Sequence, residues 1–205
     1  MTSFGKKIVC LAVVTLLSVT GIITGSVLSG RKSEKTAGGT LETQLLKMIS
    51  SDSLPADRNF GSTGYCKFRN LPQEIRREYP DVGADFEVGI IKYDINKDGK
   101  AELFVDAIRN HGNNAYGFDV FTPHNGKLQK CGEVGGVQLS AMTLNGRSGI
   151  IDKWRIGGSC RVYTFRELVN GKLTDTVTIE VERGNDPVFS VKINSKNASA
   201  FDHLF

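Results

Sequence analysis

The chain has 205 residues and a formal net charge of +4, with 40% hydrophobic and 23% charged residues. This composition is typical of a globular protein and excludes a disordered chain. Lys6 and Lys7 are the only charged residues in the first thirty, and the remainder carries 24 basic against 22 acidic residues. Such a balance gives no electrostatic basis for binding nucleic acid, so we expect no nucleic-acid partner.

Residues 8–28 follow this basic pair as an uncharged and mostly apolar run. A signal peptide needs roughly 7–15 apolar residues and a membrane-spanning helix about 20. We therefore interpret residues 1–30 as a signal peptide or a membrane anchor, and the sequence leaves both alternatives open. Either one places the remainder outside the cytoplasm, secreted or periplasmic or held at the membrane of a bacterial cell envelope.

Residues 31–39 are polar and rich in small side chains, which predicts a linker before a domain at residues 40–205. Thr40 is a plausible N-cap for a following helix. The helix has one apolar face, formed by Leu41, Leu45, Leu46 and Ile49. A second short helix is expected at residues 71–80, with Pro72 in its first turn and Pro80 at its end.

Residues 50–64 are rich in turn formers and predict a loop, whereas short, partly alternating strands begin near Asp85. The expected strands are 86–93, 102–108, 116–121, 127–134, 149–156, 160–168, 172–182 and 188–193. Turn signals separate several of them, at Asn113-Asn114, Asn125-Gly126 and Asn170-Gly171. The expected fold class is α+β: mostly antiparallel β hairpins, as a curved sheet or small sandwich, with two short N-terminal helices packed on it and a hydrophobic signal or anchor helix before them.

A weak internal repeat divides the domain. The tetrapeptide Asn-Gly-Lys-Leu at residues 125–128 recurs 45 residues later at 170–173. This period resembles that of a propeller blade, but two units cannot close a propeller. We therefore expect two hairpin repeats at about 86–134 and 135–182, with chance recurrence of a common turn sequence as the alternative.

The segment DINKDGKAE, residues 94–102, places acidic or amide side chains at positions 1, 3, 5 and 9 of a tight loop. A glycine at position 6 allows a sharp turn, after which the carbonyl of position 7 faces inward. Calcium prefers oxygen ligands of this kind and number. The candidate metal ligands are Asp94, Asn96, Asp98, the carbonyl of Lys100, and Glu102. The alternative is a turn that binds no metal.

Helix–loop–helix calcium sites need a Glu at position 12, which is Val105 here, in an expected strand. The segment instead resembles the calcium loops of extracellular VCBS and FG-GAP-like β-repeats, whose pattern D-x-[DN]-x-D-G-x-x-[DE] it matches at every position. The resemblance covers about 45 residues and implies a structural calcium ion held by the five groups named above. The chain has one such loop instead of several, and it lacks the Phe-Gly…Gly-Ala-Pro signature. Propeller architecture and integrin-like ligand binding are therefore not implied.

Three cysteines follow the N-terminal segment: Cys66, Cys131 and Cys160. In an oxidising compartment one pair is expected to form a disulfide, and Cys131 with Cys160 is the preferred pair because both lie at ends of strands in adjacent hairpins. Small, reduced core residues are the alternative.

The sequence contains no recognisable motif of a serine hydrolase, zinc protease or phosphate-binding loop, and we assign no catalytic residue. Trp154, Tyr163 and Phe165 either form an exposed aromatic patch or pack in the core. The expected function is a binding or interaction module at the cell envelope with one structural calcium loop. Its partner would be an unknown envelope protein or glycan. The alternatives are an envelope hydrolase with structural calcium, or an inhibitor or immunity protein of such an enzyme.

Overall fold

The computed structural model describes residues 39–54, 64–106, 116–184 and 189–205. The expected signal or anchor segment, nearly all of the linker and the Asn113-Asn114 turn lie outside the described residues. Within the described part of the chain, no helix is long and apolar enough to cross a membrane.

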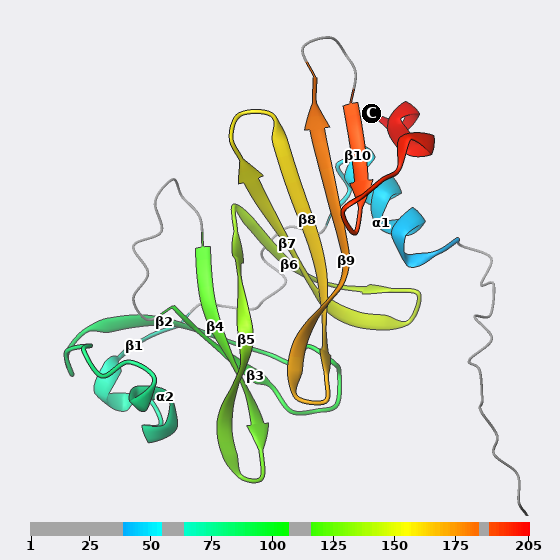
Figure 1. The fold of residues 1–205 in the computed structure, drawn as a ribbon. Helices are drawn as coiled ribbons and strands as arrows, with labels where there is room; N and C mark the ends of the chain where they lie inside the picture. The colour runs from blue at the N-terminus through cyan, green and yellow to red at the C-terminus, as the bar shows by residue number, and fades with distance from the viewer. Residues whose placement is uncertain (1–38, 55–63, 107–115, 185–188) are drawn as a thin grey trace, which may run out of the picture. The chain divides into compact units, whose positions relative to one another are not determined.

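The described strands form two antiparallel sheets in which every strand pairs with its neighbours in sequence (Figure 1). The first sheet contains β1 (Gly64–Lys67), β2 (Glu87–Tyr93), β3 (Glu102–Asp106), β4 (Tyr116–His124) and β5 (Lys127–Gly136). The second contains β6 (Gln138–Leu144), β7 (Arg147–Ile156), β8 (Cys160–Val169), β9 (Lys172–Arg183), β10 (Phe189–Ile193) and β11 (Lys196–Asn197). The expected fold class is confirmed at the level of mostly antiparallel β-structure with a few short helices.

Three strands were not expected from the sequence. β1 begins at the end of a segment predicted as a loop, and β11 has only two residues. β6 is buried at five of its seven positions, so polar and apolar residues do not alternate along it. A strand buried on both faces lacks the period-2 signal on which sequence prediction depends.

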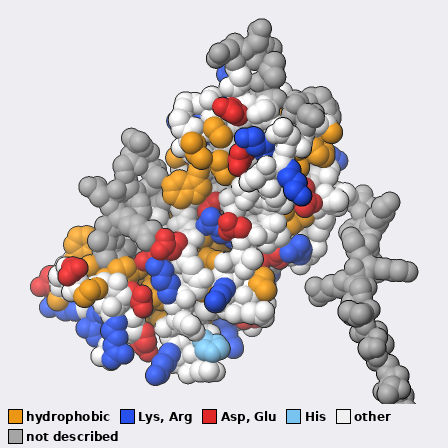
Figure 2. Space-filling model, in the orientation of Figure 1, with side chains coloured by type: hydrophobic (Ala, Val, Ile, Leu, Met, Phe, Trp, Pro, Cys, Tyr) orange, Lys and Arg blue, Asp and Glu red, His pale blue; other side chains and the backbone are white. Residues whose placement is uncertain are grey.

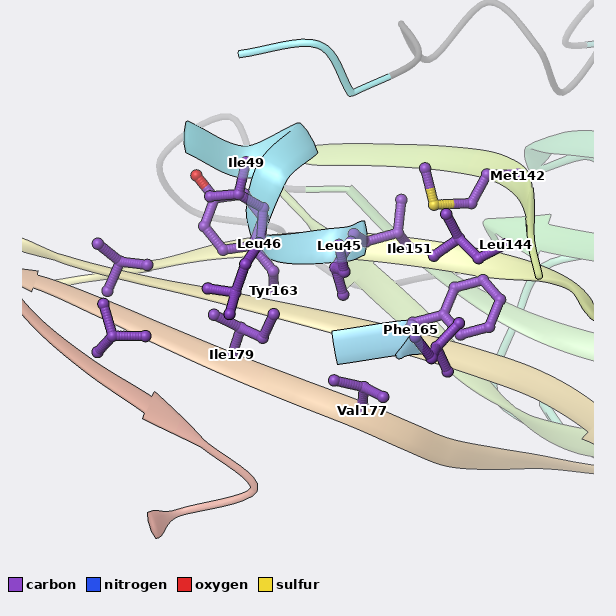
Figure 3. Close-up of a cluster of buried hydrophobic side chains, with 13 residues drawn as sticks. Leu45, Leu46, Ile49, Met142, Leu144, Ile151, Tyr163, Phe165, Val177 and Ile179 are labelled. Atoms are coloured by element: carbon purple, nitrogen blue, oxygen red, sulfur yellow. The ribbon is translucent and has the colours of Figure 1, made fainter. Parts of the chain in front are cut away.

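Helix α1 (Leu41–Ser50) covers one face of the second sheet. Thr40 caps it as expected, because its side chain accepts a hydrogen bond of 3.3 Å from the Thr43 N–H. Figure 3 shows the apolar side of the helix lying against the strands. Leu45 and Leu46 are completely buried there. Burying a leucine side chain stabilises the fold by about 1.5–3 kcal/mol, so this helix is fixed by packing more than by its cap.

Helix α2 (Gln73–Arg77), with a preceding 3-10 helix at Phe68–Asn70, covers one face of the first sheet. The cluster joins Phe68, Leu71 and Ile75 to Val88, Leu103, Val105 and Phe121. The helix is shorter than the predicted span of residues 71–80: it ends at Arg77, with Glu78 as its C-cap, before Pro80 is reached. Pro72 is its N-cap residue.

A third cluster is shared by the two sheets and joins them. Side chains alternate between the faces of a strand, so Leu103 and Val105 face α2 whereas Phe104 faces the second sheet. The shared cluster consists of Ile91, Ile95, Phe104, Phe118, Val120, Cys131 and Val134 on the side of the first sheet, and Leu139, Ala141 and Ile150 on the other.

The hairpins β4–β5 and β8–β9 have the same local geometry. Each turns through an Asn-Gly pair with positive φ at both residues: 49° and 74° at Asn125-Gly126, and 50° and 72° at Asn170-Gly171. Turns of this kind match the twist of the strands they join, and Asn and Gly adopt positive φ more readily than other residues. Both turns were predicted from the sequence.

The two hairpins also bend at the same place. The register shifts between Val120 and Phe121 in the first hairpin, and between Phe165 and Arg166 in the second. These positions are 45 residues apart, which is the period of the sequence repeat. A bulge inserts one residue on one strand and increases its local twist, so the repeated tetrapeptide marks two hairpins with the same bend.

Candidate metal-binding loop and polar clusters

The candidate calcium loop connects β2 to β3 and is anchored from within. Ile95, its second residue, is 1% exposed and belongs to the cluster shared by the sheets. Lys97 and Gly99 have φ of 59° and 86°, which folds the chain back on itself. The side chain of Lys97 also reaches the second sheet, where its Nζ lies 2.8 Å from the Thr143 hydroxyl.

The side chains at positions 1 and 3 of the loop converge on one backbone amide. The Asp98 N–H lies 3.1 Å from Asp94 Oδ1 and 3.3 Å from Asn96 Oδ1. The other Asp94 oxygen accepts the Gly99 N–H at 2.8 Å. The oxygens of Asp94 and Asn96 are therefore close together and held in fixed directions by the backbone.

Asp98, at position 5, belongs to the same group. Its Oδ1 accepts the Lys100 N–H at 2.8 Å, and its Oδ2 accepts a hydrogen bond of 3.2 Å from the Asn96 amide. Each carboxylate oxygen has two lone pairs, so one hydrogen bond leaves a lone pair for a cation. Asp94, Asn96 and Asp98 thus fit the donor set that calcium takes.

Glu102 is placed differently from the other candidate ligands. It is 1% exposed at the start of β3, and it accepts the Ile95 N–H at 2.9 Å and the Thr122 hydroxyl at 3.1 Å. Burial raises the pKa of Glu102, although these hydrogen bonds oppose the effect. Its side chain ties the end of the loop to its beginning, which is a structural role that the sequence pattern did not reveal.

Within the described residues, no group of three or more His, Cys, Asp or Glu side chains is placed to hold a metal ion. The loop differs from a group of that kind because its converging side chains are only two carboxylates and one amide. A further oxygen ligand that the sequence suggests is the backbone carbonyl of Lys100. Calcium binding by this loop stays a prediction.

A polar cluster lies where α2 meets the first sheet. Asp119 in β4 is 7% exposed; its Oδ2 accepts the Tyr79 hydroxyl, and its Oδ1 lies 2.9 Å from Lys130 Nζ. Lys130 also lies 2.9 Å from Glu133 Oε1. Burial alone would lower the pKa of Lys130, but its hydrogen bonds to the two carboxylates outweigh burial and raise that pKa.

A second polar cluster links the two sheets through Arg166 in β8. Its guanidinium lies 2.7 Å from Asp152 Oδ2 in β7 and 2.7 Å from Asp175 Oδ1 in β9, and it donates to the Glu133 carbonyl in β5 at 2.9 Å. The Asp152 side chain has no exposed surface. Burial raises the pKa of Asp152 to about 6, with Arg166 acting in the opposite direction.

Neither cluster was found by sequence reasoning. Asp119 and Asp152 each occur as a single acid within a strand, and their partners lie up to 40 residues away along the chain. The only local signal is an acidic residue flanked by buried apolar ones, as Asp119 is by Phe118 and Val120.

The expected disulfide is absent from the structure. Cys66, Cys131 and Cys160 are all free thiols in the described residues. Cys131 is buried in the cluster between the sheets, where its Sγ lies 3.3 Å from the Val120 carbonyl oxygen, and burial raises its pKa to about 12. Cys66 belongs to β1 and Cys160 to β8, in different sheets. The prediction of a Cys131–Cys160 bond was wrong, because Cys131 lies in the cluster between the sheets whereas Cys160 lies beside Ile156 and Glu182 at the start of β8. The alternative of small, reduced core residues describes Cys131, whereas Cys66 and Cys160 are free but only half-buried.

The three aromatic residues of the second repeat separate onto two faces. Tyr163 and Phe165 are buried beneath α1, as expected if they pack in the core. Trp154 lies on the opposite face and is 38% exposed. Because side chains alternate between the faces of a strand, the three aromatic residues do not form one exposed patch.

Comparison with known proteins found no match to this chain among family models, curated proteins or solved structures. The resemblance of residues 94–102 to the VCBS and FG-GAP-like calcium loops therefore stays a prediction.

Proposed function

We propose that this chain is an exported or membrane-anchored binding module of the cell envelope, stabilised by one calcium ion in the β2–β3 loop. The observation that carries the proposal is the convergence of Asp94 and Asn96 on the Asp98 amide. Hydrogen bonds from the backbone hold these oxygens in place before any ion binds, which lowers the cost of ordering them around one.

The position of the loop supports a structural role for the ion. The loop is anchored in the shared cluster through Ile95 and to the second sheet through Lys97. A cation held here would therefore stabilise the junction of the two sheets. Calcium sites of extracellular modules bind at roughly 10⁻⁴–10⁻³ M, and exported proteins commonly meet calcium in that range, so we expect a structural ion and not a switch.

Calcium titration of the full-length, metal-free protein tests the proposal. A ligand that binds only the folded state stabilises it by about 0.4–1.4 kcal/mol at one to ten times its dissociation constant, which is the range that millimolar calcium reaches at such a site. We expect millimolar calcium to raise the melting temperature and to give a calorimetric binding signal. Asp94→Ala and Asp98→Ala should abolish both effects.

Lys100→Ala is the matched control, because position 7 contributes only its carbonyl and the variant should respond like the wild type. The Asn145-Gly146 turn, between β6 and β7, has no carboxylate and should contribute no binding. The proposal fails if the wild type shows neither heat nor a change in melting temperature at millimolar calcium.

Localisation is tested separately. The uncharged run behind Lys6 and Lys7 leads us to expect a tagged full-length protein in the membrane fraction or outside the cytoplasm. Recovery of the uncleaved chain in the cytosol would refute export without bearing on the calcium loop.

A further inference from the structure

The face of the second sheet opposite α1 packs on the first sheet at Ile150, and beyond that contact it combines apolar and acidic side chains. The register places Trp154 beside Val162 and Glu180, and Ile156 beside Cys160 and Glu182. We call these six residues the Trp154 face. Their neighbours along the same strands, Ile151, Tyr163 and Ile179, point to the other side and are buried under α1. One face of the second sheet is thus covered by α1. The other face packs on the first sheet through the shared cluster, and the Trp154 face is the part of it that lies outside that cluster.

Two large apolar side chains of this face are exposed to solvent. Ile156 is 61% exposed and Trp154 38%. Figure 2 shows hydrophobic side chains gathered with charged ones on the visible side of the molecule. Two large apolar residues together on one sheet face indicate an interaction surface more strongly than single exposed ones.

The same face carries two glutamates, Glu180 and Glu182, and one lysine, Lys192, which the register places beside Glu180. Glu180 lies 3.5 Å from Lys192, but Glu182 has no ion-pair partner among the described residues. The two glutamates also affect their neighbour: burial raises the pKa of Cys160, the charges of Glu182 and Glu180 raise it further, and the charges of Lys192 and Arg161 oppose this effect. A partner that covers the apolar row would bring its own charges beside these carboxylates, and basic groups would complement them.

We propose that the Trp154 face binds a segment of a partner protein in which an apolar side chain is flanked by lysine or arginine. Ile156 and Val162 offer no hydrogen bonds, so an apolar partner side chain fits them better than a sugar hydroxyl does. Glu182 supplies the site for a basic flanking residue. The assignment rests on the proposed role as a binding module, but it involves neither the calcium loop nor its ion.

The probe is a synthetic peptide, Lys-Leu-Lys-Leu-Lys-Leu, compared with Glu-Leu-Glu-Leu-Glu-Leu as the charge-reversed control. Trp154 is the only tryptophan of the chain, so the fluorescence of the full-length protein reports this face directly. The basic peptide should shift the emission of Trp154 to shorter wavelength, with an affinity that falls as salt is added. The acidic peptide should leave the emission unchanged.

Ile156→Ser and Glu182→Gln should each weaken binding of the basic peptide by roughly tenfold, as expected for central interface residues. Val169→Ser is the matched control, because Val169 is 46% exposed at the far end of β8. The bound peptide should also slow alkylation of Cys160, while Cys66 on the first sheet serves as the internal reference.

Three results would overturn the proposal. Equal binding of both peptides would show non-specific apolar contact. A dimer in sedimentation that Ile156→Ser dissociates would assign the face to a second copy of the chain. A shift of Trp154 emission with an N-acetylglucosamine oligosaccharide, and none with the basic peptide, would assign it to a glycan. Calcium titration tests only the β2–β3 loop, and the peptide titration tests only the Trp154 face. Failure of the calcium proposal is therefore distinguishable from failure of the peptide-binding proposal.

Discussion

Replacement of Asp152 by Asn tests the electrostatics of the junction between the sheets. The carboxyl group of Asp152 is buried next to Arg166, with Asp175, the side chain of Trp154 and the backbone of Gly135 as its other electrostatic neighbours. Burial raises its pKa from the ordinary value of 3.8 to about 6. Asn has nearly the same shape and does not titrate, so Asp152→Asn isolates the ionisation of this one group.

The sign follows from proton binding. Because the pKa of Asp152 is higher in the folded than in the unfolded state, the folded protein binds the proton more tightly. The stability from this proton is fully present below pH 3.8 and is lost as the pH rises through about 6. A tenfold difference in proton affinity is worth about 1.4 kcal/mol, so the two-decade difference here is worth about 3 kcal/mol.

Urea unfolding of the wild type and Asp152→Asn at pH 7 and pH 4 measures this difference. Other carboxylates titrate equally in both proteins, so they cancel from the comparison. We expect the stability of the wild type, relative to the variant, to be about 2–2.5 kcal/mol greater at pH 4 than at pH 7, because pH 4 still lies just above the unfolded-state pKa of 3.8. Arg166→Gln in the wild-type background should raise the pKa of Asp152 further. A wild-type-to-variant difference that does not change with pH would refute the reasoning.

Three further substitutions test packing and hydrogen bonding, each measured by urea unfolding at pH 7. Leu45→Ala removes a completely buried side chain of α1 and should cost about 2–5 kcal/mol. Gly149→Ala places a methyl group against the Arg166 carbonyl oxygen and the Phe165 ring and should cost about 1–3 kcal/mol or more; Gly158→Ala, which meets nothing within 4 Å, should be close to neutral. Tyr79→Phe removes a hydrogen bond to the buried Asp119 and should cost about 1–3 kcal/mol.

Each of these substitutions has a result that would contradict it. Similar stability of the Gly149 and Gly158 variants would mean that β7 and β8 are farther apart than the structure places them. A Leu45 variant as stable as the wild type would mean that α1 does not pack on the second sheet. An unchanged Tyr79 variant would mean that Lys130 alone satisfies Asp119.

The elements with strong local signals could be predicted from the sequence. Thr40 and the apolar spacing after it defined α1, and the Asn-Gly pairs defined two hairpins. β6 was missed because it is buried on both faces and has no alternation. The disulfide was predicted wrongly because chain order alone does not show that Cys131 lies between the sheets and Cys160 at the start of β8.

In the candidate site, too, local contacts could be predicted from the sequence and contacts between distant residues could not. The spacing of Asp94, Asn96 and Asp98 could be recognised because their oxygens converge within a single loop. The contact between Glu102 and Thr122 could not, since Thr122 lies 20 residues away and is brought to Glu102 only by the pairing of β3 with β4. The ion pair between Asp152 and Arg166 could not be predicted either, because it depends on the register between β7 and β8.

The order of strands has a consequence for how the chain folds. Each described strand pairs with a neighbour in sequence, so most sheet contacts close short loops, and low contact order favours fast folding. Helix α1 is the exception: Leu45 precedes its partners Val177, Ile179 and Val191 by more than 130 residues. During synthesis the helix emerges first, but its binding surface is completed last. Both sheets can therefore form while the apolar face of α1 is still exposed, and docking of this helix is the step most open to interception by a chaperone or by another chain.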